Sequence, residues 1–214
     1  MQNMINTAPF VITISRQLGS GGAYIGQQLA KHLNVFYADR EIISQAAKEL
    51  SVVKEALEFR DEKILSFWQS FVRSFAVAPV PYVTPQIADP TDHELFKAES
   101  EIITRIAKER SAVIIGRCGS YILREHPNRV GIFLHANVSF RKDRVQKLYS
   151  VSEEVAEKMI AQSDEDRSLY HHAVTGQEWT DARRYDISID TSKIGVDQSV
   201  DFILHYLELA KEGR

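Results

Sequence analysis

The 214-residue sequence has little of the material that several classes of protein need. Its single cysteine, Cys118, has no partner within the chain for a disulfide, and no apolar run approaches the roughly 20 residues of a membrane-spanning helix. The formal net charge is only −3, so the composition predicts no generally basic surface for nucleic acid. The N-terminal residues lack the basic-then-apolar pattern of a signal peptide. We therefore expect a cytoplasmic protein that binds neither nucleic acid nor a membrane.

What is present predicts an α/β fold. Five short apolar or β-branched runs cover residues 11–14, 35–37, 113–115, 130–134 and 187–189. Because these runs are continuous rather than alternating, they predict strands that are covered on both faces. Helical patterns lie between most of them, which favours a parallel sheet with helices on both sides. The length argues against two full domains, so we expect one domain over residues 1–214.

Residues 51–92 interrupt this alternation. Four of the six prolines fall in the sequence APVPYVTPQIADP, and proline cannot continue a helix. The preceding half has helical character and carries the aromatic residues Phe67, Trp68, Phe71 and Phe75. We interpret the segment as an insert. Its aromatic side chains fit a satellite core, a substrate cleft or the contact of a homodimer.

The sequence ITISRQLGSGGAYIGQQLA joins the first predicted strand to a helical pattern through a glycine-dense turn. Backbone N–H groups at such a turn, together with the positive end of the helix, attract phosphate oxygens. The usual loop of this kind reads G-x-x-x-x-G-K-[ST]. Here Gly22 follows Gly21 where lysine is expected, and no Ser or Thr comes directly after it. Two interpretations of Arg16 are open: it supplies the missing cation, or it forms a surface ion pair.

Several residues of this turn are candidates for phosphate binding. They are Ser15, Arg16, Gly19, Ser20, Gly21, Gly22, Ala23 and Tyr24. A dinucleotide-binding turn is the main competing interpretation, with Asp39 about 20 residues on as the ribose partner. However, G-x-G-x-x-G counted from Gly19 and Gly21 reaches Tyr24 instead of glycine. An NAD(P)-dependent oxidoreductase and a purely structural glycine turn are therefore alternatives to a phosphate loop.

Three stretches together resemble the cytidylate kinase-like family of P-loop proteins, relatives of the nucleoside monophosphate kinases. They are the glycine-rich turn with FYADREII after it, VIIGRCGSYIL, and DEDRSLYHHAVTGQEWTDARRYDISIDTS. The resemblance implies a P-loop NTPase fold with a monophosphate-binding insert at residues 51–92 and a lid at residues 150–180. It also implies phosphoryl transfer that uses ATP and Mg²⁺, with CMP or dCMP as the expected acceptor.

The resemblance also assigns roles to single positions. Arg117 in GRCG falls where monophosphate kinases place an arginine at the acceptor phosphate, and Cys118 stands where cytidylate kinases have an aspartate. Gly22 and Tyr24 stand where the resemblance to this family places the lysine and the threonine of its motif. Arg167 lies in the lid. On this basis a catalytically weak or inactive nucleotide-binding regulatory module is an alternative function, because the lysine and the hydroxyl are absent.

Phosphoryl transfer disperses negative charge, which guanidinium groups can hold in fixed geometry. We predict Arg16, Arg117 and Arg167 as catalytic residues, with Asp164 orienting Arg167. On the acceptor side we add Asp39 and Arg40 to Arg117, because ADRE follows the second predicted strand.

A second pair of arginines lies on the predicted helix after the fourth strand. Arg141 and Arg144 are spaced i and i+3, so they face the same side. They fit either a lid function or a solvated face with Asp143 and Lys147.

Other reactive residues carry weaker signals. His171 and His172 point about 100° apart on a helix, so we predict no metal site there. Cys118 has no His and acid partner that would make it a nucleophile. Trp179 is expected to pack ahead of the fifth strand, with stacking on a base as the alternative.

Overall fold

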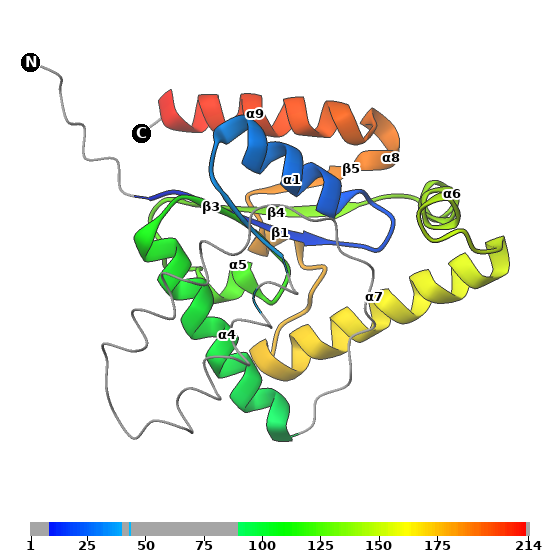
Figure 1. Cartoon of the computed structure of the whole chain (residues 1–214), viewed down its shortest axis with the longest axis horizontal. Helices are drawn as coiled ribbons and strands as arrows, with labels where there is room; N and C mark the ends of the chain where they lie inside the picture. The colour runs from blue at the N-terminus through cyan, green and yellow to red at the C-terminus, as the bar shows by residue number, and fades with distance from the viewer. Residues whose placement is uncertain (1–8, 40–42, 44–89, 213–214) are drawn as a thin grey trace, which may run out of the picture.

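Five parallel strands form one sheet in the order β2-β3-β1-β4-β5 in the computed structural model, which describes residues 9–39, 43 and 90–212 (Figure 1). The strands are β1 Val11–Arg16, β2 Phe36–Ala38, β3 Ala112–Ile115, β4 Arg129–His135 and β5 Ile187–Asp190. Each strand falls on one of the five predicted runs, and all four neighbouring pairs are parallel. The predicted α/β class and parallel sheet are confirmed.

Helices cover both faces of this sheet. The described helices are α1 Gly22–Leu33, α4 Pro90–Glu109, α5 Gly119–Ile122, α6 Val138–Tyr149, α7 Glu153–Thr175, α8 Thr191–Ile194 and α9 Val196–Glu212, with the 3₁₀ helix η1 Ala182–Arg184. Figure 1 shows α1 and α9 on one face and α4 with α5 on the other. None of the helices in the described ranges is long and apolar enough to cross a membrane.

Two predicted segments have different outcomes. Residues 44–89, which hold nearly all of the predicted insert and its aromatic side chains, lie outside the described residues, so the cleft and the homodimer contact stay predictions. The predicted lid coincides with α7 and the turn that follows it. Its closure stays a prediction.

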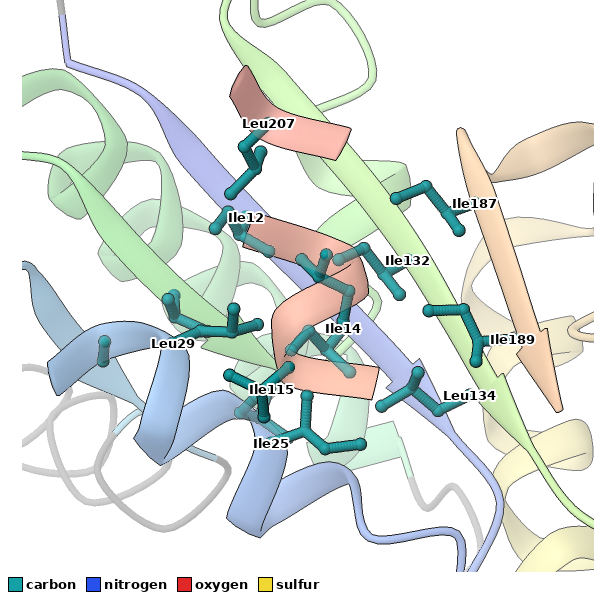
Figure 2. Close-up of a cluster of buried hydrophobic side chains, with 14 residues drawn as sticks. Ile12, Ile14, Ile25, Leu29, Ile115, Ile132, Leu134, Ile187, Ile189 and Leu207 are labelled. Atoms are coloured by element: carbon teal, nitrogen blue, oxygen red, sulfur yellow. The ribbon is translucent and has the colours of Figure 1, made fainter. Parts of the chain in front are cut away.

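Alternate residues of β1 enter two separate cores. Val11 packs in the cluster beneath α4, whereas Ile12 and Ile14 pack in the cluster beneath α1 and α9. Figure 2 shows the second cluster, where Leu29 from α1 and Leu207 from α9 join the strand residues. Burying one such side chain contributes about 1.5 to 3 kcal/mol, so the two cores hold the helices firmly against the sheet.

The carboxyl ends of β1 and β3 form the topological switch point of the sheet, where the connections from two neighbouring strands leave on opposite faces. These two strands are neighbours in the sheet, yet α1 leaves β1 on one face and α5 leaves β3 on the other. Open parallel sheets bind ligands at such switch points, where adjacent connections diverge. The glycine-rich turn after β1 lies at this point.

Candidate phosphate-transfer site

The turn between β1 and α1 depends on two glycines with left-handed backbones. Gly19 and Gly21 have φ values of +84° and +89°, which side chains other than hydrogen rarely adopt. A β-carbon at Gly19 would lie 2.8 Å from the carbonyl oxygen of Arg141, and one at Gly21 would lie 2.9 Å from Cγ1 of Val196. Both positions therefore need glycine for backbone conformation and for space.

The helix that follows begins without a side-chain cap. Gly21 is the N-cap residue of α1, no side chain caps this end, and the first turn contains no acidic residue. The buried Ser20 hydroxyl is turned inward, where it donates to the Gln17 carbonyl oxygen at 2.8 Å. The positive end of a 12-residue helix thus faces the switch point without a carboxylate of its own.

Arg16 crosses the carboxyl edge of the sheet at this point. Its aliphatic stem lies against Gly22, because a β-carbon added there would be 2.5 Å from Arg16 Cγ. Its guanidinium lies at the end of β3, since a β-carbon on Gly116 would be 2.3 Å from Arg16 Nη1. Burial and the Asp39 carboxylate raise the pKa of Tyr37 against the opposing charge of Arg16. Arg16 therefore extends from β1 to the carboxyl end of β3.

Asp164, near the middle of α7, ties three groups together beside the turn. Its carboxylate accepts from the Leu18 N–H at 3.1 Å and from Arg141 Nη1 at 2.5 Å. Arg167 Nη1 lies 3.6 Å from the same carboxylate. The structure thus brings the predicted pair of Asp164 and Arg167 together, and it adds Arg141 and the backbone of the phosphate loop to them.

The two arginines of α6 differ from each other. Arg141 is buried, at 5% exposure, so the solvated-face interpretation is wrong for this residue. Arg144 is partly buried, with its guanidinium 5.9 Å from the centre of the Phe140 ring. Burial lowers the pKa of Arg144, and the neighbouring Asp197 opposes this shift. Tyr24 donates to the same Asp197 at 2.7 Å.

Arg117 follows β3 and is held inside the protein. Its Nη2 lies 3.0 Å from Oε1 of Glu99, which is 0% exposed, and its guanidinium lies 5.3 Å from the centre of the Tyr170 ring. Tyr170 donates to the other Glu99 oxygen at 3.3 Å. In this conformation Arg117 joins α4 to α7, and its predicted contact with an acceptor phosphate stays a prediction.

Cys118 sits next to this ion pair as a buried thiol. Burial raises its pKa to about 12, against the charge of Arg117, so the thiol is neutral at physiological pH. A neutral thiol is a poor nucleophile. The structure therefore gives Cys118 a packing position.

The remaining sequence candidates lie apart from this site. His171 Nδ1 donates to the Gln177 carbonyl oxygen at 3.0 Å, whereas His172 lies 3.5 Å from Glu178. Within residues 9–39, 43 and 90–212, no group of three His, Cys, Asp or Glu side chains is arranged to hold a metal. Trp179 is buried with its ring 5.5 Å from the Phe133 ring, so the prediction that it packs ahead of β5 is confirmed.

The acceptor-side candidates are only partly described. Asp39 directly follows β2 and contributes to the raised pKa of Tyr37, and its role on the acceptor side stays a prediction. Arg40 lies outside the described residues. The site as described therefore consists of the turn after β1, Arg16, and the group of Arg141, Asp164 and Arg167.

Comparison with solved structures identifies the class of fold. Shikimate kinase from Acinetobacter baumannii in complex with shikimate aligns over 96% of each chain with 11% identity and a TM-score of 0.51. A gluconokinase from Sinorhizobium meliloti 1021 aligns over 96% of this chain and 97% of its own, with 12% identity and a TM-score of 0.51. An uncharacterized protein from Eubacterium ventriosum ATCC 27560 is more similar, with 26% identity, 94% and 99% coverage, and a TM-score of 0.71. The fold is that of the P-loop kinases.

The family follows from the sequence comparison. The model of the cytidylate kinase-like family matches residues 11–193, and this chain belongs to that family. No curated protein matches the sequence. The oxidoreductase alternative finds no support in these matches, whereas a kinase-like, nucleotide-binding fold does.

Proposed function

We propose that this protein transfers the γ-phosphoryl group of Mg·ATP to a nucleoside monophosphate, with CMP or dCMP as the preferred acceptor. The observation that carries the proposal is the set of cations around the turn between β1 and α1. The stem of Arg16 lies against Gly22 and its guanidinium over Gly116, while Arg141 and Arg167 pair with Asp164, which accepts from Leu18 of the turn. Membership of the cytidylate kinase-like family supports the choice of acceptor.

The transfer needs positioned charge more than reactive side chains. The bond between the γ-phosphorus and its bridging oxygen breaks, an oxygen of the acceptor phosphate forms the new bond, and ADP leaves with the electron pair. A dianionic acceptor phosphate has no proton to lose. Backbone N–H groups of the turn hold donor phosphate oxygens, and guanidinium groups stabilise the charge that spreads over the transferred group.

Magnesium enters this scheme as part of the nucleotide substrate. The usual Ser or Thr ligand of the loop is replaced, and the described residues contain no cluster of metal ligands. Mg²⁺ bridges donor phosphate oxygens and neutralises part of their charge. The protein's own contribution is therefore the placement of phosphates and the exclusion of water.

We assign acceptor binding to Asp39, which directly follows β2, and to Arg40, the next residue in the sequence before the segment predicted as the insert. Arg117, which the family resemblance places at the acceptor phosphate, is paired with Glu99 in the structure. With that ion pair in place, its role is to fix the end of β3 against α4 and α7.

A coupled assay of ADP formation tests the function. We expect turnover with Mg·ATP and CMP or dCMP, slower turnover with AMP, GMP or UMP, and none with shikimate or gluconate. Changing Arg167 to Gln should lower kcat/KM by at least about 100-fold, because an aligned donor to the developing charge is lost. The matched control is Arg183→Gln, which removes an arginine that is 89% exposed and lies on η1.

Two other outcomes would replace this proposal. Nucleotide binding without ADP formation from any acceptor would assign the chain to the nucleotide-binding regulatory modules. Turnover confined to shikimate or gluconate would retain the kinase chemistry and overturn the nucleotide acceptor.

A further inference from the structure

Compared with the usual motif, the phosphate loop of this chain has an arginine at the position of the first glycine and a glycine at the position of the lysine. With Gly21 as the second glycine of G-x-x-x-x-G-K-[ST], the first glycine of the motif falls at position 16 and the lysine at position 22. This chain has Arg16 and Gly22 there. A cation therefore occupies a glycine position, and a glycine occupies the cation position.

The two residues are in direct contact, so the exchange is also a steric one. A β-carbon on Gly22 would lie 2.5 Å from Arg16 Cγ, 2.8 Å from Cβ and 3.4 Å from Cδ. Real β-carbons do not approach other heavy atoms below 3.0 Å. A lysine at position 22 is excluded while Arg16 keeps this course, and Arg16 keeps it only because position 22 has no side chain.

The far end of Arg16 reaches the place where donor and acceptor must meet. Its Nη1 lies over Gly116, at the carboxyl end of β3, and Gly116 has a φ of +74°. The β1 and β3 ends form the switch point of the sheet, and Asp39 follows β2 on the acceptor side. The guanidinium thus lies between the start of α1 and the predicted acceptor residues.

We propose that Arg16 supplies the phosphate-binding cation of this loop in place of the lysine, and that Gly22 is a glycine because the Arg16 side chain passes over it. The inference deepens the proposed function and rests on it for the identity of the nucleotide. The planar guanidinium holds two phosphate oxygens at once, where an ammonium acts as a point charge. The alternative, in which Arg16 only forms a surface ion pair, predicts that removing the Arg16 charge does not change phosphate binding.

Calorimetric titration of Mg·ATP and of sodium tripolyphosphate tests this assignment. Arg16→Met keeps the aliphatic stem over Gly22 and removes the charge, so we expect both affinities to fall by about 10- to 100-fold with little change in melting temperature. Arg16→Lys should recover part of the loss. The combined variant Arg16→Gly with Gly22→Lys, which restores the usual motif, should bind within about tenfold of the native protein. Arg183→Met is the control for removal of any surface charge.

The outcomes separate this inference from the proposed function. Native affinity in Arg16→Met for both ligands overturns the inference and leaves the function standing. Binding that depends on Arg16, without ADP formation from any acceptor, supports the inference and overturns the function. If the native protein binds neither ligand, both are overturned.

A second measurement serves if Arg16→Met does not fold. Gly22→Ala should displace Arg16 and weaken tripolyphosphate binding, whereas the same change in an Arg16→Gly protein, which has no β-carbon at position 16, should leave binding and stability unchanged. Equal effects of Gly22→Ala in the two backgrounds would contradict the steric exchange.

Discussion

Three successive residues after β3 have left-handed backbones. Gly116, Arg117 and Cys118 have φ values of +74°, +48° and +53°. For residues with side chains, this conformation costs of the order of 1 to 2 kcal/mol each. The ion pair of Arg117 with the fully buried Glu99 offsets part of that cost and directs the chain away from the end of the sheet. The strained turn leaves room over Gly116 for the Arg16 guanidinium.

Two glycines with similar positive φ values allow the cost of backbone strain to be measured apart from the cost of a steric clash with Arg16. Gly176 has a φ of +68° and nothing within 4 Å of an added β-carbon, whereas Gly116 faces Arg16. Gly176→Ala should lower the free energy of unfolding by about 1 to 2 kcal/mol and leave Mg·ATP affinity unchanged. Gly116→Ala should cost at least as much and also weaken Mg·ATP binding. Urea denaturation and calorimetry measure the two effects, and equal ATP affinity in both variants would contradict the placement of Arg16.

For single residues, the sequence identified the candidates in the loops but not the side chains that contact them. Glu99 is the clearest case, because it falls on the apolar face that Ile102, Ile103 and Ile106 mark in α4. A carboxylate at a core-facing helical position predicts a buried cation, so a signal existed. The course of Arg16 over Gly22 carried no such signal, since it depends on a side-chain conformation.

Helix α7 is the element that connects the phosphate loop to the rest of the site. Asp164 accepts from Leu18 of the loop and pairs with Arg141 from α6. Asp164→Asn should reduce the free energy of unfolding by about 2 kcal/mol, because the charged partners lose a largely buried carboxylate. Urea denaturation measures this. Glu154→Gln removes an exposed ion pair with Lys158 on the same helix and should have no measurable effect.

The end of α7 carries a pH-sensitive contact. Burial lowers the pKa of His171 below 6.5, and the bond to the Gln177 carbonyl and the charge of Glu178 oppose this shift. At pH values between the lower pKa of His171 in the folded protein and the pKa of 6.5 in the unfolded chain, the unfolded chain binds more protons. The neutral, buried His171 therefore contributes fully to stability above pH 6.5, and this contribution is lost as the pH falls through the pKa of the folded protein. From about pH 7.5 to about pH 5.5, His171→Gln should lose less stability than the native protein, and the exposed His172→Gln should lose as much. Identical slopes in urea midpoints for all three proteins would refute the role of His171.

Strand boundaries were predictable to within one or two residues, and one deviation has a clear cause. The run 35–37 predicted a strand, yet β2 begins at Phe36. The Val35 N–H instead bonds to the Ala30 carbonyl at 2.9 Å, which closes the end of α1 behind the left-handed Asn34. Helix termination therefore uses the amide that the strand ladder would have taken.

The whole molecule brings together residues that are far apart in the chain. Leu18 and Asp164 are separated by 146 positions, and Arg16 meets Gly116 across the sheet. Periodicity gives the strands and helices, because it depends on neighbours within a few residues. It does not give the order β2-β3-β1-β4-β5, which places the ends of β1 and β3 side by side. The family resemblance supplied the P-loop fold that local patterns alone could not.

Stability of the whole fold should respond to the ligand that the loop holds. A ligand that binds only the folded state at a hundred times its Kd stabilises that state by about 2.7 kcal/mol, which for a chain of this size raises Tm by roughly 5 to 10 °C. We expect this shift with Mg·ATP in differential scanning calorimetry. NADH at the same concentration should give none, because the turn has Tyr24 where a dinucleotide fingerprint requires glycine. A shift with NADH and none with Mg·ATP would reverse the assignment of the turn.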